Sequence, residues 1–105
     1  MKYFRLKKQT DFQKLFQKGN RAFSSSLTMI YRVSDKPTFG ISIGKRHGKS
    51  VQRNRIKRLI REAFRKEREI IKGTYSIVFV PKVAETYDFH TFSQHIRCMI
   101  KKNNL

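Results

Sequence analysis

Positive charge is concentrated in one segment of the chain, residues 48–65, which reads GKSVQRNRIKRLIREAFR and holds seven Lys or Arg but a single acid, Glu62. Apolar residues recur through it at helical spacing, so the cations fall on the outer face of an amphipathic helix. Arg53, Lys57 and Arg61 stand at i, i+4 and i+8, where like charges repel one another. Guanidinium groups match phosphate oxygens in pairs and stack on bases. The chemistry that this segment predicts is the binding of a polyanion, with nucleic acid as the first candidate.

Two other interpretations of the basic helix are a merely solvated face and a membrane-surface helix. A face that is only solvated usually mixes both signs of charge, because Glu–Lys pairs add stability and solubility. A membrane-surface helix presents its apolar stripe to lipid. Here the stripe is needed as core, since few other residues are available to cover a sheet. Both interpretations are therefore less favoured than nucleic acid.

The start of this helix also suits phosphate. Gly44 and Gly48 precede it, and Ser50 is placed to cap it. Glycines allow a phosphate to approach the backbone closely, and the helix dipole favours an anion at the N-terminal end. We expect a phosphate-binding edge at this point.

The bulk numbers agree with a small basic domain. The chain has 105 residues, and 25 Lys and Arg against 7 Asp and Glu give a net charge of +18. Its 38% hydrophobic content, including nine Phe, is sufficient for one core. We expect a single RNA-binding domain over residues 1–105. One cysteine, Cys98, excludes an internal disulfide, and no apolar run approaches the about 20 residues of a membrane span. These features favour a cytoplasmic location and no membrane partner.

Hydrophobic periodicity predicts the elements that position the charge. Alternation predicts two strands joined as an antiparallel hairpin, and a continuous apolar run predicts a strand buried on both faces. The expected elements are helices over residues 10–19, 51–71 and from 88 onward, strands over residues 26–33, 38–44 and 75–80, and a further short strand near residues 21–23. The predicted fold is α+β: a mixed four-stranded sheet packed with helices, in the order α-β-β-(β)-α-β-α.

No catalytic group is predicted in this chain. A two-metal nuclease needs several converging carboxylates, and the seven acids show no such clustering. His47, His90 and His95 have no spacing that suggests an acid–base pair. Cys98 is interpreted as a small buried hydrophobe, and no zinc-ligand spacing is present. We therefore expect neither a catalytic nor a metal-binding residue.

Residues 40–65 resemble the signature of the bacterial ribonuclease P protein component. The resemblance lies in Arg53-Asn54-Arg55 followed by Ile-Lys-Arg-Leu-Ile-Arg-Glu, and residues 6–19 resemble the opening helix of that family. It implies an α/β sandwich akin to an RNA-binding domain of a ribosomal protein, with a left-handed βαβ crossover around the motif helix. It also implies the role of a protein subunit that assists removal of the 5′ leader from precursor tRNA, while a large RNA catalyses the cleavage with Mg²⁺ bound to that RNA.

The resemblance also implies two sets of contact residues. Those expected to face the catalytic RNA are Arg53, Asn54, Arg55, Lys57, Arg58 and Arg61, with the basic pair Lys45 and Arg46; the neighbouring cations Lys49 and Arg65 are added to this set for their charge. Lys49 stands where the family pattern more often has Asn. Those expected in a cleft for the single-stranded leader are Phe12, Phe16, Ser42 and a strand residue that aligns with either Ile30 or Tyr31. The spacing of Phe12 and Phe16 suits a plain core role equally.

Three functions stay open from the sequence. The first is the ribonuclease P subunit, which would contact the catalytic RNA and precursor tRNA with one protein per RNA. The second is a ribosomal or general RNA-binding protein without a role in cleavage. The third, against which the scattered carboxylates speak, is a nuclease that acts alone.

Overall fold

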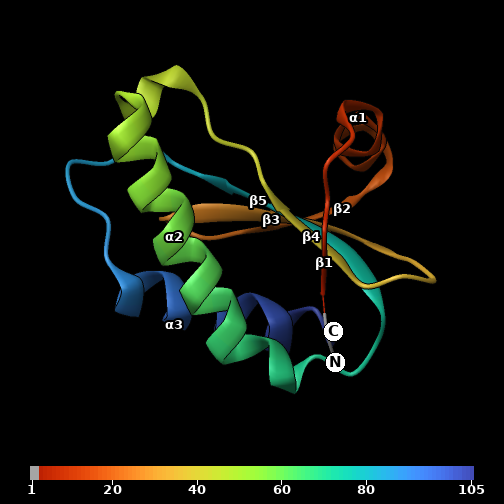
Figure 1. Ribbon diagram of the computed structural model, residues 1–105. Coiled ribbons are helices and arrows are strands. Elements are labelled where there is room, and N and C mark those ends of the chain that lie inside the picture. The colour runs from red at the N-terminus through yellow and green to blue at the C-terminus, as the bar shows by residue number, and fades with distance from the viewer. Residues whose placement is uncertain (1–2) are drawn as a thin grey trace.

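The computed structural model describes residues 3–105 of the chain, which form one sheet covered by helices (Figure 1). The helices are α1 (Gln9–Lys18), α2 (Ser50–Glu67) and α3 (Phe89–Lys102), with short 3-10 helices η1 (Lys45–His47) and η2 (Arg68–Ile70) at the two ends of α2. The strands are β1 (Phe4–Arg5), β2 (Asn20–Phe23), β3 (Leu27–Val33), β4 (Thr38–Ile41) and β5 (Tyr75–Pro81). None of the helices in this part of the chain is long and apolar enough to cross a bilayer.

The sheet is mixed and has five strands in the order β1-β4-β5-β3-β2. The α+β class and the short strand near residues 21–23 are confirmed, whereas the predicted count of four strands omitted β1, which pairs parallel with β4. The parallel neighbours β4 and β5 are joined through α2, as the implied βαβ unit requires. Its left-handed sense stays a prediction.

The predicted hairpin between β3 and β4 is wrong. β5 lies between them, antiparallel to β3 and parallel to β4, and β3 instead forms its hairpin with β2. The reason is that β5 is apolar on both faces, and such a strand is most stable in the middle of a sheet covered on both sides. The linker of residues 34–37 therefore crosses the end of β5, where Ser34 N–H donates to Thr74 O at 3.1 Å.

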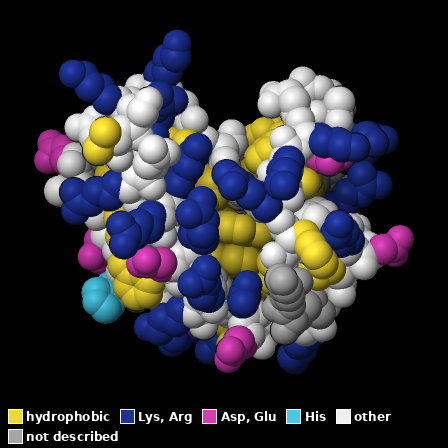
Figure 2. Space-filling view, viewed as in Figure 1, with side chains coloured by type: hydrophobic (Ala, Val, Ile, Leu, Met, Phe, Trp, Pro, Cys, Tyr) yellow, Lys and Arg dark blue, Asp and Glu magenta, His cyan; other side chains and the backbone are white. Residues whose placement is uncertain are grey.

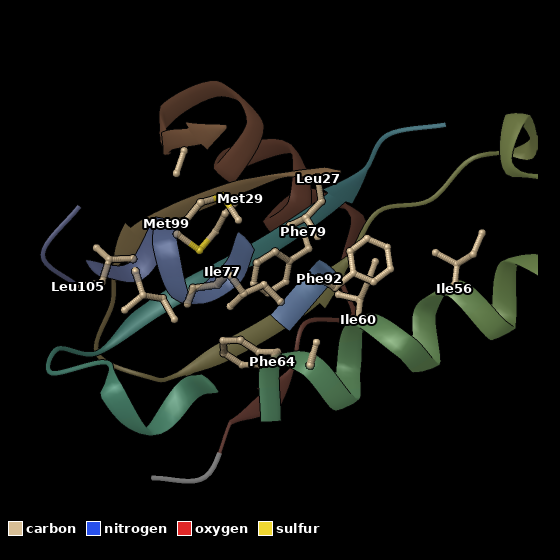
Figure 3. Close-up of a cluster of buried hydrophobic side chains, with 14 residues drawn as sticks. Leu27, Met29, Ile56, Ile60, Phe64, Ile77, Phe79, Phe92, Met99 and Leu105 are labelled. Atoms are coloured by element: carbon tan, nitrogen blue, oxygen red, sulfur yellow. The ribbon is translucent and has the colours of Figure 1, made fainter. Parts of the chain in front are cut away.

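The larger core lies between the sheet and the pair of helices α2 and α3 (Figure 3). α2 contributes Ile56, Ile60, Ala63 and Phe64, which are all buried. Figure 3 shows Phe64 and Ile60 directed toward Phe79 of β5. The predicted helix over residues 51–71 is longer than α2, which ends at Glu67, and Ile70 lies in η2, where it is 38% exposed and outside this core.

A smaller core lies on the other face of the sheet, beneath α1. Leu15 of α1 packs there on Ile30 and Val78, which are fully buried. The chain leaves α1 at Gly19 in close contact with this core. A Cβ atom at position 19 would lie 2.6 Å from Leu15 O and 2.7 Å from Ile30 Cγ2, so only glycine fits.

Cys98 is exposed, so its interpretation as a small buried hydrophobe is wrong. The buried side of α3 consists of Phe92, Ile96, Met99 and Ile100. Cys98 lies two residues from both Ile96 and Ile100, and two residues correspond to about 200° around a helix. Its side chain therefore points away from the core.

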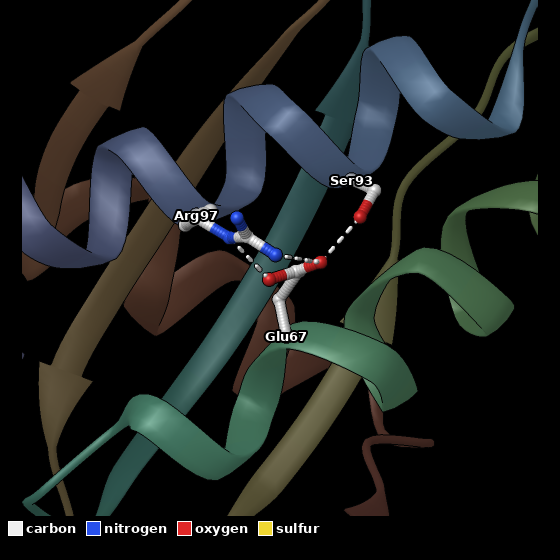
Figure 4. Close-up of polar contacts among 3 residues, drawn as sticks. All are labelled: Glu67, Ser93 and Arg97. Atoms are coloured by element: carbon white, nitrogen blue, oxygen red, sulfur yellow. Dashed lines mark hydrogen bonds and ion pairs between the residues drawn. The ribbon is translucent and has the colours of Figure 1, made fainter.

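A buried acid joins α2 to α3 (Figure 4). Glu67 is 3% exposed and accepts hydrogen bonds from Arg97 Nε at 2.8 Å and from the Ser93 hydroxyl. Burial opposes ionisation of Glu67, but the hydrogen bonds from Arg97 and Ser93 outweigh it and hold the pKa of this carboxyl below its ordinary value of 4.5. Glu67 is therefore ionised at neutral pH, and its hydrogen bonds to Arg97 and Ser93 link α2 to α3.

Replacing Glu67 with Gln should lower the free energy of unfolding by about 1–3 kcal/mol, because charge-assisted hydrogen bonds to a buried group are lost. The folded-state pKa lies below the unfolded value, so this contribution is complete above pH 4.5 and is lost as the pH falls. Urea unfolding of both proteins at pH 7 and pH 3 should show the difference shrinking. Glu62 forms an exposed ion pair with Arg58, with 3.6 Å between Arg58 Nε and Glu62 Oε1. Glu62→Gln should therefore change the free energy of unfolding by less than about 0.5 kcal/mol. Equal effects of the two substitutions would contradict this role of Glu67.

Candidate nucleic-acid interface

A cation-lined cleft of about 580 Å³ lies beside α2. One wall consists of Lys57, Arg61 and Arg65 on one side of α2, spaced four residues apart, and of Arg68 at the start of η2, which continues the same row. We call these four residues the cationic row. Figure 2 shows apolar side chains at the base of a hollow that Lys and Arg side chains border. The helix positions this row because its opposite side is buried in the larger core.

The rest of the cleft is built from the N-terminal segment and the edge of the sheet. Its other lining residues are Tyr3, Phe4, Arg5, Leu6, Lys7, Phe12, Phe39, Gly40 and Ile41. The Phe12 ring lies against Gly40, where a Cβ atom would be 2.9 Å from Phe12 Cζ. The glycine therefore allows an aromatic side chain of α1 to reach the floor of the cleft. An aromatic wall thus faces a cationic wall across one groove.

The cations of this face are largely free of acids from the same chain. Among residues 3–105, ion pairs join only Arg58 to Glu62, at 3.6 Å, and Arg97 to Glu67. Three acids, Glu62, Glu67 and Glu69, lie close to the basic residues of α2 in the sequence. The Glu67 carboxylate does not neutralise them, because it points inward to α3. The cationic row is therefore a set of charges that the chain leaves to be neutralised by something else.

Arg53 differs from the other residues of the basic motif. It is half-buried, its Nη2 donates to Ser50 Oγ at 3.2 Å, and its buried Nε has no hydrogen-bond partner within the described residues. Ser50 was predicted to cap α2, but the cap is provided by Gln52, whose Oε1 accepts from Lys49 N–H at 2.9 Å. Arg53 is thus partly a packing residue at the start of the helix.

The other predicted RNA-facing residues lie at or near the surface. Asn54, Arg55, Arg58, Arg61 and Arg65 are exposed on α2, Lys57 is half-buried, and Lys45, Arg46 and Lys49 are exposed around η1. The turn after η1 requires Gly48, whose φ is +109°. Arg55 points to a different side of α2 from the cationic row, because it lines a second pocket.

Of the residues predicted for a leader cleft, only Phe12 lines the cleft beside α2. Ile30 is fully buried beneath α1, so it has no surface to offer a ligand. Tyr31 projects from the opposite face of the sheet, as alternation requires, and its hydroxyl donates to Asn103 Oδ1 at 3.3 Å. Tyr31 therefore does not line this cleft. Phe16 packs against the smaller core, and the half-buried Ser42 lies outside the lining of the cleft.

Sequence reasoning missed the lining residues from the N-terminal segment, Phe4, Arg5 and Lys7, and also Arg68. A weak signal was present in Phe4, Arg5, Leu6 and Lys7, where apolar residues alternate with cations as in a strand, but four residues are too few to establish a period. The segment is short, and its pairing with β4 brings together residues more than thirty positions apart in the sequence. That pairing could not be seen from local pattern.

These features define an α+β protein that presents a fixed basic face and a cation-lined groove to a polyanion. The family model described as Ribonuclease P matches residues 1–104. Similar chains include the ribonuclease P protein components of Clostridioides difficile, 35% identical over 95% of this chain and 91% of that protein, and of Caldanaerobacter subterraneus, 36% identical over 99% and 92%. This chain belongs to the family of ribonuclease P proteins.

Solved structures agree. The ribonuclease P protein of Thermotoga maritima superposes with a TM-score of 0.82 at 26% identity, covering 94% of this chain and 96% of that one. The Staphylococcus aureus protein gives 0.82 at 27% identity, covering 97% and 96%. Membership makes the chain the protein component of a ribonucleoprotein endoribonuclease whose partner, the ribonuclease P RNA, performs the catalysis.

Some cations of α2 are exposed and others contribute to packing, and unfolding experiments can distinguish the two groups by their effect on the free energy of unfolding. Arg55→Ala and Arg61→Ala should each change the free energy of unfolding by less than about 0.5 kcal/mol, because both side chains are exposed and unpaired with acids among residues 3–105. Arg53→Ala should cost about 1 kcal/mol through loss of packing and of the bond to Ser50. Urea unfolding measures all three. A large loss of stability in Arg61→Ala would show that the cationic row supports the fold.

Proposed function

We propose that the cleft holds the 5′ leader of precursor tRNA while the other exposed cations of α2 and η1 bind the catalytic RNA. The observation that carries the proposal is the pairing of an unneutralised cationic wall with an aromatic wall in one groove. Proteins hold single strands in this way, with cations along the backbone and aromatic faces under the bases.

The cleft suits a single strand through three features. The cationic row is spaced along a rigid helix, so its charges follow the direction of a strand that lies beside it. Phe12 and Phe4 provide aromatic surface, and Phe4 is 45% exposed. Gly40 has no side chain of its own, so the Phe12 ring can lie against the sheet at the cleft. Phe12 acts both as core, against the smaller cluster, and as cleft wall.

The residues assigned to the catalytic RNA are those on the remaining basic surface. They are Lys45, Arg46, Lys49, Asn54, Arg55 and Arg58, with Arg53 positioned at the helix start. Lys57, Arg61 and Arg65 line the cleft and lie between the two RNAs. Neutralisation of phosphates there lowers the repulsion between substrate and catalytic RNA.

In this proposal the Mg²⁺ ions bound by the RNA supply the hydrolytic chemistry. Residues 3–105 bring together no group of three or more His, Cys, Asp or Glu that could hold a metal ion. The protein residues bind the leader, orient it and reduce phosphate repulsion, which lets the complex form at lower Mg²⁺ concentration. We place this particle in the cytoplasm, with one protein per RNA.

Reconstitution tests the proposal. The chain should cleave nothing by itself, and with its cognate ribonuclease P RNA it should restore cleavage of precursor tRNA at a Mg²⁺ concentration at which the RNA alone is inactive. Affinity should rise with leader length until the cleft is filled. If precursor and mature tRNA bind equally to the complex, the chain is a general RNA-binding protein and the leader assignment fails.

The aromatic wall can be tested in the same assay. Phe12→Leu keeps apolar bulk for the smaller core but removes the ring, so it should weaken binding of precursor tRNA by about 1–3 kcal/mol. Binding of mature tRNA should not change. Phe23→Leu is the matched control, because Phe23 is 69% exposed on β2 and does not line the cleft. Equal behaviour of the two variants would exclude Phe12 as a leader contact.

The charge contribution should appear as a salt dependence. The logarithm of the association constant should fall with the logarithm of salt concentration by about 0.7–0.9 for each phosphate contacted. Arg61→Ala should reduce the magnitude of this slope by about one such increment when precursor tRNA is titrated into the complex. A slope that does not respond to loss of Arg61 would show that this side chain touches no phosphate.

A further inference from the structure

A second pocket, of about 350 Å³, lies at the N-terminal half of α2 on a different side from the cleft. It extends to the loop between β5 and α3. Arg55, the second arginine of the Arg-Asn-Arg motif, lines this pocket, whereas Lys57 lines the cleft. Two residues apart on a helix are about 200° apart around it. The basic helix therefore presents cations to two separate cavities.

The pocket combines apolar, aromatic and oppositely charged walls. Ile56 and Leu59 provide the apolar wall, and Tyr87 with His47 the aromatic one. Arg55 and Glu85 bring charges of opposite sign to the same cavity, although no ion pair joins them. Pockets of about 300–1,000 Å³ with apolar walls and a few polar groups are typical of small-ligand sites.

The aromatic wall is held in place before any ligand binds. The Tyr87 hydroxyl forms a hydrogen bond of 2.7 Å with His47 Nδ1 and accepts from Ala84 N–H at 3.2 Å. The Tyr87 ring also stacks on Phe92 of the larger core, with the centroids 6.3 Å apart. One side chain therefore joins η1, the loop before α3 and the core. A wall fixed in this way lowers the entropic cost of binding.

We propose that this pocket receives an unpaired guanine base of the catalytic RNA, an inference that rests on the chain's partnership with that RNA. Guanine offers O6 and N7 as acceptors, the atoms that an Arg side chain such as Arg55 recognises in pairs. Its Watson–Crick edge offers N1–H and the N2 amino group as donors, which the carboxylate of Glu85 can accept together. Tyr87 and His47 provide the aromatic surface on which unstacked RNA bases are held.

Other ligands fit these walls less well. A phosphate group would be attracted to Arg55 and repelled by Glu85. Adenine lacks an N1 proton and carries no O6, so it satisfies neither charged group fully. Pyrimidines present a smaller face to the aromatic wall, and they lack the N7 and O6 pair.

Chemical probing of the reconstituted complex tests the guanine proposal. A dicarbonyl reagent that adds to N1 and N2 of unpaired guanine is applied to the RNA with and without saturating protein. The wild-type protein should protect at least one unpaired guanine outside the tRNA-binding region. Glu85→Gln should restore its reactivity and weaken binding of the RNA by about fivefold or more.

Glu69→Gln is the control, because this substitution changes the net charge by the same amount as Glu85→Gln. Glu69 is exposed in η2 and lies outside the pocket. It should keep the protection. Identical protection by wild-type protein and Glu85→Gln would overturn the proposal. A titration with guanosine 5′-monophosphate, followed by NMR at His47 and Tyr87, forms a second arm. Binding of the free nucleotide without any protected RNA guanine would also overturn it. Failure of the proposed leader function would instead appear as unaltered protection without stimulated cleavage.

Discussion

Burial of one side of α2 is the constraint on which the basic surface depends. Ile56, Ile60 and Phe64 are almost completely removed from solvent against the sheet and α3. Each such side chain stabilises the fold by about 1.5–3 kcal/mol, whereas each like-charged pair at i, i+4 costs about 0.2–0.5 kcal/mol. Burial therefore outweighs the repulsion by a wide margin. The helix can carry on its outer side a row of cations that would not hold their positions in an isolated peptide.

The placement of acids strengthens this effect. Glu67 is the acid of α2 that is best protected from solvent, and it is directed to Arg97 and Ser93 of α3 instead of to its own helix face. The same carboxylate thus fixes the angle of α2 and leaves the cationic row without that neutralising charge. Stability of the fold and availability of the charge are two results of one side-chain orientation. With a net charge of +18, the free chain gains further from any polyanion that binds this face.

Periodicity was sufficient to predict the helices, the central strand β5 and the basic face, because each of these is determined by residues close in sequence. Periodicity did not predict the strand order, because that order depends on pairing between residues far apart in the sequence. β5 enters between β3 and β4 only because its two apolar faces demand a central position, and no local pattern shows which strands flank it. β1 is too short to give a period, and its partner lies far along the chain. Neither alternative for the strand residue lines the cleft, because Ile30 is buried beneath α1 and Tyr31 lies on the other face of β3.

The two cavities beside α2 lie on different sides of the helix, because helical periodicity directs their lining residues in different directions. Residues 57, 61, 65 and 68 share one side and border the cleft, whereas residues 52, 55, 56 and 59 share another and border the second pocket. An RNA that occupies the pocket and a strand that occupies the cleft are then separated by the body of the helix. Under the two proposals the cationic row faces the strand in the cleft and Arg55 faces the RNA in the pocket, so positive charge of the protein would lie between the phosphates of the two RNAs. Under these proposals one rigid element would contribute to the affinity for each RNA and determine the distance between them.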